Sequence, residues 1–285
     1  MSGDNNRGRL EPPAAAFAPA TGPAGTRPGD RVGAPVRERQ VPAVERAIAI
    51  LRLLARSESP LGVQAIAREL GLVPSTCLHI LRVLVAEELA GFDPETKRYR
   101  LDAGILSIAR GVLGRSSFSR LVQPALDRIA KRHAVTANAV RVVGLAHGTV
   151  VAMSHAAQPF HIHVGVGSRF PALVSVTGRC IAAFGNHDWA DIEEAFHRVR
   201  WERPPSLRAW RGEVEEARRT GYAVDAGNYI CGITIVGAPV MDRGRVGHVI
   251  VGIGLTEQLK AARRARLGRD LQAAAREMSE RLRRE

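Results

Sequence analysis

The sequence predicts an α+β fold divided into a smaller N-terminal domain and a larger C-terminal domain. Three short helical segments followed by a hairpin fill the first part of the chain that is expected to be ordered. Beyond them, strands and helices follow one another without strict alternation, which favours a mainly antiparallel sheet covered by helices. With 285 residues and 45% hydrophobic side chains, the chain is long enough for two domains of ordinary size.

Residues 1–40 are rich in Pro, Ala and Gly and nearly free of large apolar side chains, so we expect a disordered arm. A first helix is expected from Pro42, because apolar residues recur there at helical spacing: Val44, Ala47, Ile48, Leu51 and Leu54. A second helix is expected to end at Gly71, since glycine tolerates the left-handed conformation, and to bury Val63, Ile66, Ala67 and Leu70.

A third helix is predicted to begin at Pro74, because proline at the first helical position loses no hydrogen bond. Its core-facing side chains are expected to be Cys77, Ile80, Leu81 and Leu84. Two extended runs, 89–93 and 98–101, flank a turn at 94–97 and predict a hairpin. Three helices and a hairpin in this order predict a winged helix-turn-helix over residues 41–101, a unit whose third helix enters the major groove of DNA.

Asp102 is predicted to cap a linker helix over residues 102–116 that also helps the chain to dimerise. The larger domain is expected over residues 117–285. Its helices are predicted at 118–133, 175–184, 188–199 and 207–220, and Thr256 is expected to cap a last helix. Its strands are predicted at 139–145, 150–155, 161–164, 222–225, 233–240 and 246–253.

Charge alone does not identify a DNA-binding segment. The formal net charge is +13, but residues 41–113 carry nine basic and eight acidic side chains, so the surplus lies mainly in residues 114–285. DNA binding must therefore be argued from the motif.

Cys77, Cys180 and Cys231 share no metal-like spacing and suggest a reduced, cytoplasmic setting. No uninterrupted apolar run of about 18 residues occurs, so we expect no membrane span.

Several ordered motifs resemble those of the IclR family of transcriptional regulators. The N-terminal ones are residues 45–51, 65–72, 74–76 and 98–101, and the C-terminal ones are residues 167–171, 178–179, 219–222, 232 and 238–240. The resemblance covers about residues 42–259. It implies a GAF-like effector domain, a homodimer or homotetramer, and action on double-stranded operator DNA as a repressor or an activator, without catalysis.

The predicted DNA-contacting residues lie on the third helix and the hairpin. Ser75 and Thr76 can bind a phosphate at the start of the helix. Leu78 can contact a thymine methyl group, and His79 and Arg82 can reach base edges or phosphates. Phosphate or minor-groove contacts are expected from Lys97, Arg98 and Arg100. Two positions depart from the family pattern, which usually has Arg at position 79 and Gly at position 97.

The resemblance places an effector pocket at Val176, Thr177, Asp225, Ile235, Ile250 and Gly252. Several family members have Cys or Ser at the last three positions, where those side chains bind small acids. Here these positions are apolar or bare, and a buried carboxylate without donors would suffer a large desolvation penalty. We therefore expect a larger, mostly apolar or aromatic organic acid, anchored by Thr177 or a main-chain N–H. A packed core without ligand remains the alternative. The family also usually has Lys at position 179 and acidic residues at positions 227 and 228.

Other functions receive less support. His161 and His163 alternate on a predicted strand and, with His155, could bind a metal, but a solvated strand face is favoured and neither a metal nor a cofactor is expected. No nucleophile–base pair or phosphate loop indicates an enzyme. Thiol redox sensing through Cys180 or Cys231, and a protein-interaction module without DNA binding, remain the rival hypotheses.

Overall fold

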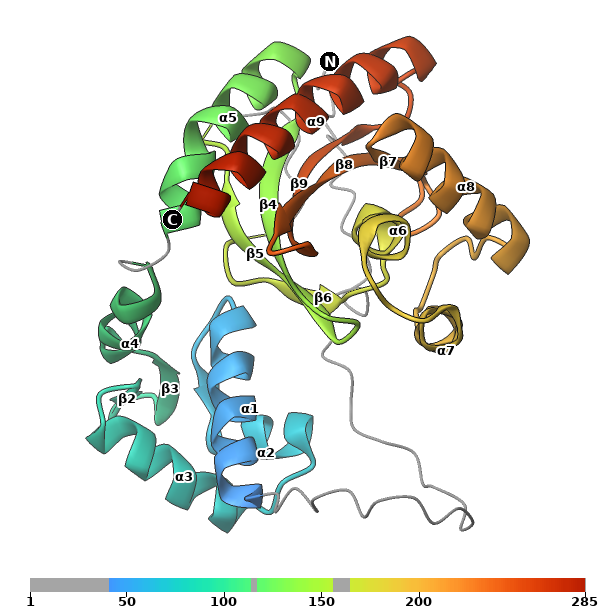
Figure 1. Ribbon diagram of the computed structural model, residues 1–285. Helices are drawn as coiled ribbons and strands as arrows, with labels where there is room; N and C mark the ends of the chain where they lie inside the picture. The colour runs from blue at the N-terminus through green and yellow to red at the C-terminus, as the bar shows by residue number, and fades with distance from the viewer. Residues whose placement is uncertain (1–40, 114–116, 156–164, 285) are drawn as a thin grey trace, which may run out of the picture. The chain divides into compact units, whose positions relative to one another are not determined.

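The computed structural model describes residues 41–113, 117–155 and 165–284, and the chain divides into two compact units between Ser116 and Ser117 (Figure 1). The expected arm over residues 1–40 and the expected strand over residues 161–164 lie outside the described residues. In the described part, no single helix is long and apolar enough to cross a membrane. The helices α2 (Val63–Leu70) and α3 (Pro74–Ala86) meet that test only when both are counted together across a 114° bend.

The N-terminal unit has the predicted helices and hairpin. Its helices are α1 (Pro42–Arg56), α2 (Val63–Leu70), α3 (Pro74–Ala86) and α4 (Gly104–Leu113). Its strands are β1 (Leu61–Gly62), β2 (Ala90–Asp93) and β3 (Arg98–Leu101), which form an antiparallel sheet in the order β1-β3-β2. Strand β1 was not predicted, because two residues are too short to show a pattern.

The helix ends lie where the sequence predicts them, but the buried face of α1 differs from the predicted one. Gly71 has φ +63° and ends α2, and Pro74 opens α3, as predicted. On α1, however, Ile50 and Leu53 are buried, whereas Val44 and Ile48 are 55% and 42% exposed. The apolar stripe of α1 is wider than the face that packs on α2 and α3, so part of it is left uncovered within this chain.

The C-terminal unit contains a six-stranded antiparallel sheet in the order β6-β5-β4-β9-β8-β7, which confirms the predicted sheet type. The strands are β4 (Thr136–Val143), β5 (His147–Met153), β6 (Arg169–Pro171), β7 (Ala223–Ala226), β8 (Ile233–Asp242) and β9 (Arg245–Leu255). The three-residue edge strand β6 was not predicted.

Helices cover both faces of this sheet (Figure 1). One face carries α5 (Ser117–His133) and α9 (Ala261–Arg284), and the other carries α6 (Ser175–Phe184), with α7 (Trp189–His197) and α8 (Leu207–Thr220) beyond it. The expected cap at Thr256 is wrong, because α9 begins five residues later. The Thr256 N–H donates to the carbonyl of Gly232, and its hydroxyl accepts from Thr234.

Side chains alternate along the neighbouring strands β8 and β9 as far as the irregularity at Val240/Met241. Toward α5 and α9 point Val236, Ala238, Val240 and Ile250; toward α6 point Ile233, Ile235, Val249, Val251 and Ile253. Because both faces are buried, the middle parts of these strands, 235–241 and 249–253, are apolar instead of alternating with polar residues.

Leu271 of α9 tests this packing, since its side chain is fully buried against the sheet. The change Leu271→Ala leaves a cavity, and we expect it to lower the free energy of unfolding by about 2–5 kcal/mol in urea titrations followed by circular dichroism. The matched control is Arg269→Ala on the exposed side of the same helix, which should change it by less than about 0.5 kcal/mol. Equal effects of the two changes would contradict the described packing of α9.

Candidate functional site

Helix α3 presents polar side chains along one exposed face. Ser75, His79 and Arg82 are exposed and lie at positions i, i+4 and i+7, so they share this face. Thr76 and Leu78 are half-buried, which leaves only part of each side chain available for contact. All five predicted residues of α3 are therefore at least partly accessible.

The β2–β3 hairpin has a rigid turn. Asp93 accepts hydrogen bonds from the Glu95 N–H at 3.0 Å and from the Thr96 hydroxyl at 2.6 Å. The bond from Thr96, followed by that from Glu95, lowers the pKa of the Asp93 carboxyl. Lys97 has φ +54°, a left-handed conformation that favours glycine. This conformation would suit the glycine that the resemblance leads us to expect here, and Lys97 adopts it directly after the turn that Asp93 closes.

The three predicted cations of the hairpin differ in their surroundings. Arg98 and Arg100 project from one face of β3, opposite the buried Tyr99. Arg98 donates from Nη1 to the carbonyl of Pro60 at 3.1 Å, so part of its donor capacity fastens the hairpin to the preceding loop. Lys97 and Arg100 make no ion pair within the described chain. Burial raises the pKa of Tyr99, and the charge of Arg82 offsets part of that rise. Tyr99 packs in one core cluster with Cys77, Leu81 and Leu84, so the hairpin lies against α3.

A small cavity of about 50 Å³ lies between the sheet and α6. Of the predicted effector residues, Val176, Thr177 and Ile235 line it, and Asp225 is buried outside its lining. The full lining is Asn138, Val140, Val150, Phe170, Val174, Ser175, Val176, Thr177, Tyr229, Ile230, Ile235, Val251 and Ile253.

The structure does not bring Ile250 and Gly252 to this cavity. Ile250 packs in the cluster with α5 and α9, and a Cβ at Gly252 would lie 3.1 Å from the Leu267 side chain of α9. Their neighbours Val251 and Ile253 line the cavity instead. Relative to this cavity, the predicted positions are displaced by one residue along β9, and a shift of one residue moves every side chain to the other face of a sheet.

Two polar lining residues were missed. Asn138 and Ser175 are 2% and 5% exposed, and neither the Asn138 Oδ1 nor the Ser175 Oγ has a hydrogen-bond partner within the described chain. Buried polar side chains are normally paired, so unpaired ones need an explanation. Asn138 could have been noticed as an amide within an apolar strand. Ser175 could not, because its φ of +51° and its burial depend on the fold.

A buried arginine, Arg179, lies beside the cavity. Arg179 is 0% exposed and contacts Glu213 at 2.6 Å, Asp225 at 3.5 Å, Asn228 Oδ1 at 3.1 Å and the Ser175 carbonyl at 2.8 Å. The Asp225 contact is an ion pair without a hydrogen bond, because the Asp225 Oδ2 has no hydrogen-bond donor. Asp225 thus balances Arg179 instead of facing the cavity.

A larger hollow of about 340 Å³ lies between α8 and α9, with Arg218, Arg219, Arg276 and Arg283 in its lining. Arg218 donates to the carbonyls of Ala182 and Ala183. Among the described lining residues, no buried side-chain polar atom lacks a partner. The smaller cavity is therefore the better candidate for a built ligand site.

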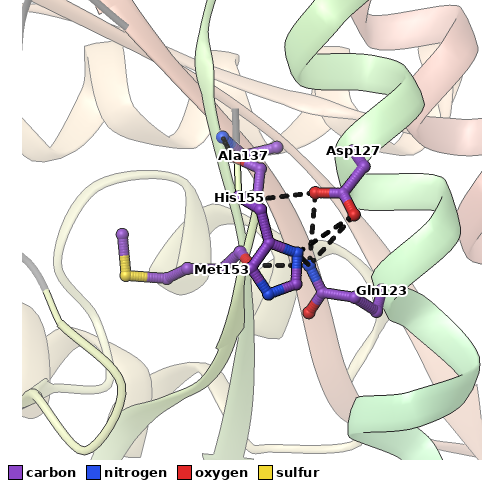
Figure 2. A network of polar contacts seen from close by, with 6 residues as sticks. Gln123, Asp127, Ala137, Met153 and His155 are labelled. Carbon is purple, nitrogen blue, oxygen red and sulfur yellow. Dashed lines mark hydrogen bonds and ion pairs between the residues drawn. The ribbon is translucent and has the colours of Figure 1, made fainter. Parts of the chain in front are cut away.

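Figure 2 shows the polar network that fastens the end of β5 to α5. Asp127 Oδ1 accepts from the His155 N–H at 2.8 Å, and the His155 Nδ1 lies 3.2 Å from Asp127 Oδ2. Gln123 donates to the carbonyl of Met153 at 2.8 Å. Burial raises the pKa of Asp127, but the hydrogen bonds from His155 and Gln123 outweigh burial and lower it.

This network bears on the metal alternative. His155 engages Asp127 through its Nδ1, and no group of three or more His, Cys, Asp or Glu residues within the described ranges is placed to hold a metal ion. His161 and His163 lie outside the described residues.

Comparison with known proteins identifies the family. The model of the "Bacterial transcriptional regulator IclR C-terminal" family matches residues 111–280, and that of the "IclR helix-turn-helix domain" matches residues 43–94. The chain belongs to the IclR family. IclR proteins are transcriptional regulators with an N-terminal helix-turn-helix and a C-terminal effector domain, and are not a family of enzymes.

Named IclR relatives cover most of the chain. The glycerol operon regulatory protein of Streptomyces griseus is 30% identical over 78% of this chain and 87% of its own. The HTH-type transcriptional repressor AllR of Escherichia coli K12 is 23% identical over 81% and 84%. An IclR regulator structure from Alicyclobacillus acidocaldarius has a TM-score of 0.74 at 25% identity, covering 85% of this chain and 99% of its own.

A further IclR structure is a homologue from Microbacterium hydrocarbonoxydans in complex with 4-hydroxybenzoate. Its TM-score is 0.67 at 20% identity, and the match covers 85% of this chain and 100% of that one. At this identity the likeness shows the shared fold.

The three thiols of this IclR chain differ in accessibility. Cys77 and Cys180 are buried, and Cys231 is exposed. Burial raises the pKa of the Cys180 thiol to about 12. The charge of Arg179 and a backbone hydrogen bond lower this pKa, but they offset only part of the rise. A thiol with such a pKa carries almost no thiolate at neutral pH, which weighs against Cys180 as a redox sensor.

Alkylation tests this difference. With iodoacetamide at pH 8, the native chain should be modified at Cys231 within minutes, while Cys77 and Cys180 should react only after unfolding in urea, as read by peptide mass spectrometry. Rapid native labelling of Cys180 would show that the thiol is reachable and would restore the redox hypothesis.

Proposed function

We propose that this regulator binds an operator through α3 and the β2–β3 hairpin, and that a small molecule in the cavity beside α6 controls this binding. The observation that carries the DNA part is the exposed polar face of α3, a helix that packs against the cationic hairpin. Functional domains over residues 1–40, 41–101, 102–116 and 117–285, and a cytoplasmic location, are parts of the same proposal.

In this proposal α3 lies in the major groove. Ser75 and Thr76 hold a phosphate at the start of the helix, where the backbone N–H groups point outward. His79 and Arg82 face the bases, and Lys97 and Arg100 hold flanking phosphates. Arg98 contributes less, because Pro60 already occupies one of its N–H groups.

The effector part rests on the cavity and its apolar lining. The homologue that binds 4-hydroxybenzoate supports a small-molecule effector by analogy. The side chains of this chain favour an apolar or aromatic compound, because valine and isoleucine make up most of the lining. Bound there, the compound would contact α6 and both central strands at once.

Arg82→Ala tests the DNA-binding face. We expect it to weaken binding to a duplex selected from a random pool by about 1–3 kcal/mol and to relax the sequence preference, since a bidentate contact with guanine is lost. The measurement is a shift assay at one fixed salt concentration. Arg56→Ala removes the same charge from the end of α1, where Arg56 contacts Glu69, and should leave binding within about two-fold. Unchanged affinity of the Arg82 variant would exclude this face.

Exposed apolar side chains on the N-terminal unit support a homodimer or a homotetramer. Val44 and Ile48 on α1, and Leu106 and Ile108 on α4, are exposed by 42–66%. Four large apolar side chains on two helices of one small unit are more typical of an interface than of a free surface. Two copies would present two α3 helices to a two-fold operator.

Sedimentation tests the dimer. The double change Ile48→Glu and Leu106→Glu should shift the chain from dimer to monomer at micromolar concentration, because charges would be buried unpaired. A control change on the same helix, Arg52→Glu at an exposed position, should preserve the dimer. A wild-type chain that sediments as a monomer would refute the proposal.

A further inference from the structure

Two polar groups in the cavity have no hydrogen-bond partner within the described chain, and no described lining residue carries a charge that could bind an anion. Asn138 Oδ1 and Ser175 Oγ are buried and unpaired in the described chain, whereas the rest of the described lining is mostly aliphatic and holds no Lys, Arg, His, Asp or Glu. Leaving such groups unpaired is costly, and a ligand that pairs them removes the cost.

The nearby cation cannot serve an anionic ligand. A guanidinium has five N–H groups. The nitrogens of Arg179 donate hydrogen bonds to Glu213, to the Asn228 side chain and to the Ser175 carbonyl, and they form an ion pair with Asp225. Two carboxylates therefore surround one guanidinium. The cluster as a whole is negative, and a buried ligand carboxylate beside it would meet repulsion as well as desolvation.

Tyr229, another lining residue, lies in the same buried and negatively charged surroundings. Burial, then the charges of Glu202 and Asp225, raise the pKa of its phenol to about 12. Negative charge on this side of the cavity is thus disfavoured for a group of the protein itself.

From these contacts we propose that the effector is an apolar, ring-sized compound whose buried polar end is an uncharged hydroxyl group, held by Asn138 and Ser175. The hydroxyl donates to the Asn138 Oδ1 and accepts from the Ser175 hydroxyl, so both orphan groups are paired by one ligand atom. A carboxylate, where the effector has one, stays outside the cavity. This inference rests on the proposed effector function and specifies its ligand class.

The cavity must widen to admit a ring. Its volume of about 50 Å³ is well below the roughly 150 Å³ of an engineered apolar cavity that binds benzene. Phe170 and Ile230 are half-buried lining residues, in contrast to the buried valines of β4, β5 and β9, so they are the side chains that can move aside.

Titration calorimetry on the full chain with phenol, its methyl ether anisole, and benzoate tests the proposal at pH 7. Phenol should bind at least about ten-fold more tightly than either of the others, since anisole lacks the donor and benzoate carries a charge. Asn138→Leu should remove the preference for phenol over anisole, and Ser175→Ala should reduce it. Asn186→Leu makes the same chemical change at an exposed position and should preserve the preference.

Several outcomes would overturn the proposal. Benzoate binding as tightly as phenol would do so, and so would a phenol preference that survives in the Asn138→Leu variant while circular dichroism shows it folded. If no compound of the three binds while the wild-type chain still shifts selected DNA, the ligand class is wrong and the DNA-binding function stands. Loss of DNA binding in the wild-type chain would instead refute the proposed function itself.

Discussion

The fold of the C-terminal unit depends on the alternation of side chains along β8 and β9. Odd-numbered positions such as Ile235 and Val251 point toward α6, and even-numbered ones such as Val236 and Ile250 point toward α5 and α9. Because both faces of the sheet are buried, a shift by one residue would exchange two differently shaped cores. This register brings Ile235, Val251 and Ile253 to the cavity.

The buried Arg179 cluster is the second constraint. A buried ion pair gains little net stability, because desolvation offsets most of the attraction, but removing one partner leaves an uncompensated charge. Here one guanidinium joins the start of α6, α8, β7 and the segment after β7 through Ser175, Glu213, Asp225 and Asn228. The cluster fixes the backbone of Ser175 at the edge of the cavity, with its hydroxyl left unpaired.

Much of the fold could be predicted from the sequence because its signals are local. The ends of α6 and α8, the glycine after α2 and the proline that opens α3 follow from spacing and backbone preference. The site was harder to predict. Within the apolar run 249–253 nothing in the sequence marks which face a residue takes, and the effector positions that the resemblance supplied, Ile250 and Gly252, lie on the face opposite the cavity. Ser175 enters the site through a backbone conformation that depends on tertiary packing. Outside the site, the predicted cap at Thr256 is wrong for a similar reason, because Thr256 bonds to Gly232 and Thr234.

The narrowness of the cavity has a kinetic consequence. If the proposed ring-sized ligand enters only when Phe170 or Ile230 moves aside, the apparent dissociation constant exceeds the intrinsic one by the inverse of the open fraction. Association then saturates at the opening rate as concentration rises, and departure waits for the same event. A switch built in this way responds slowly and ignores brief fluctuations in supply.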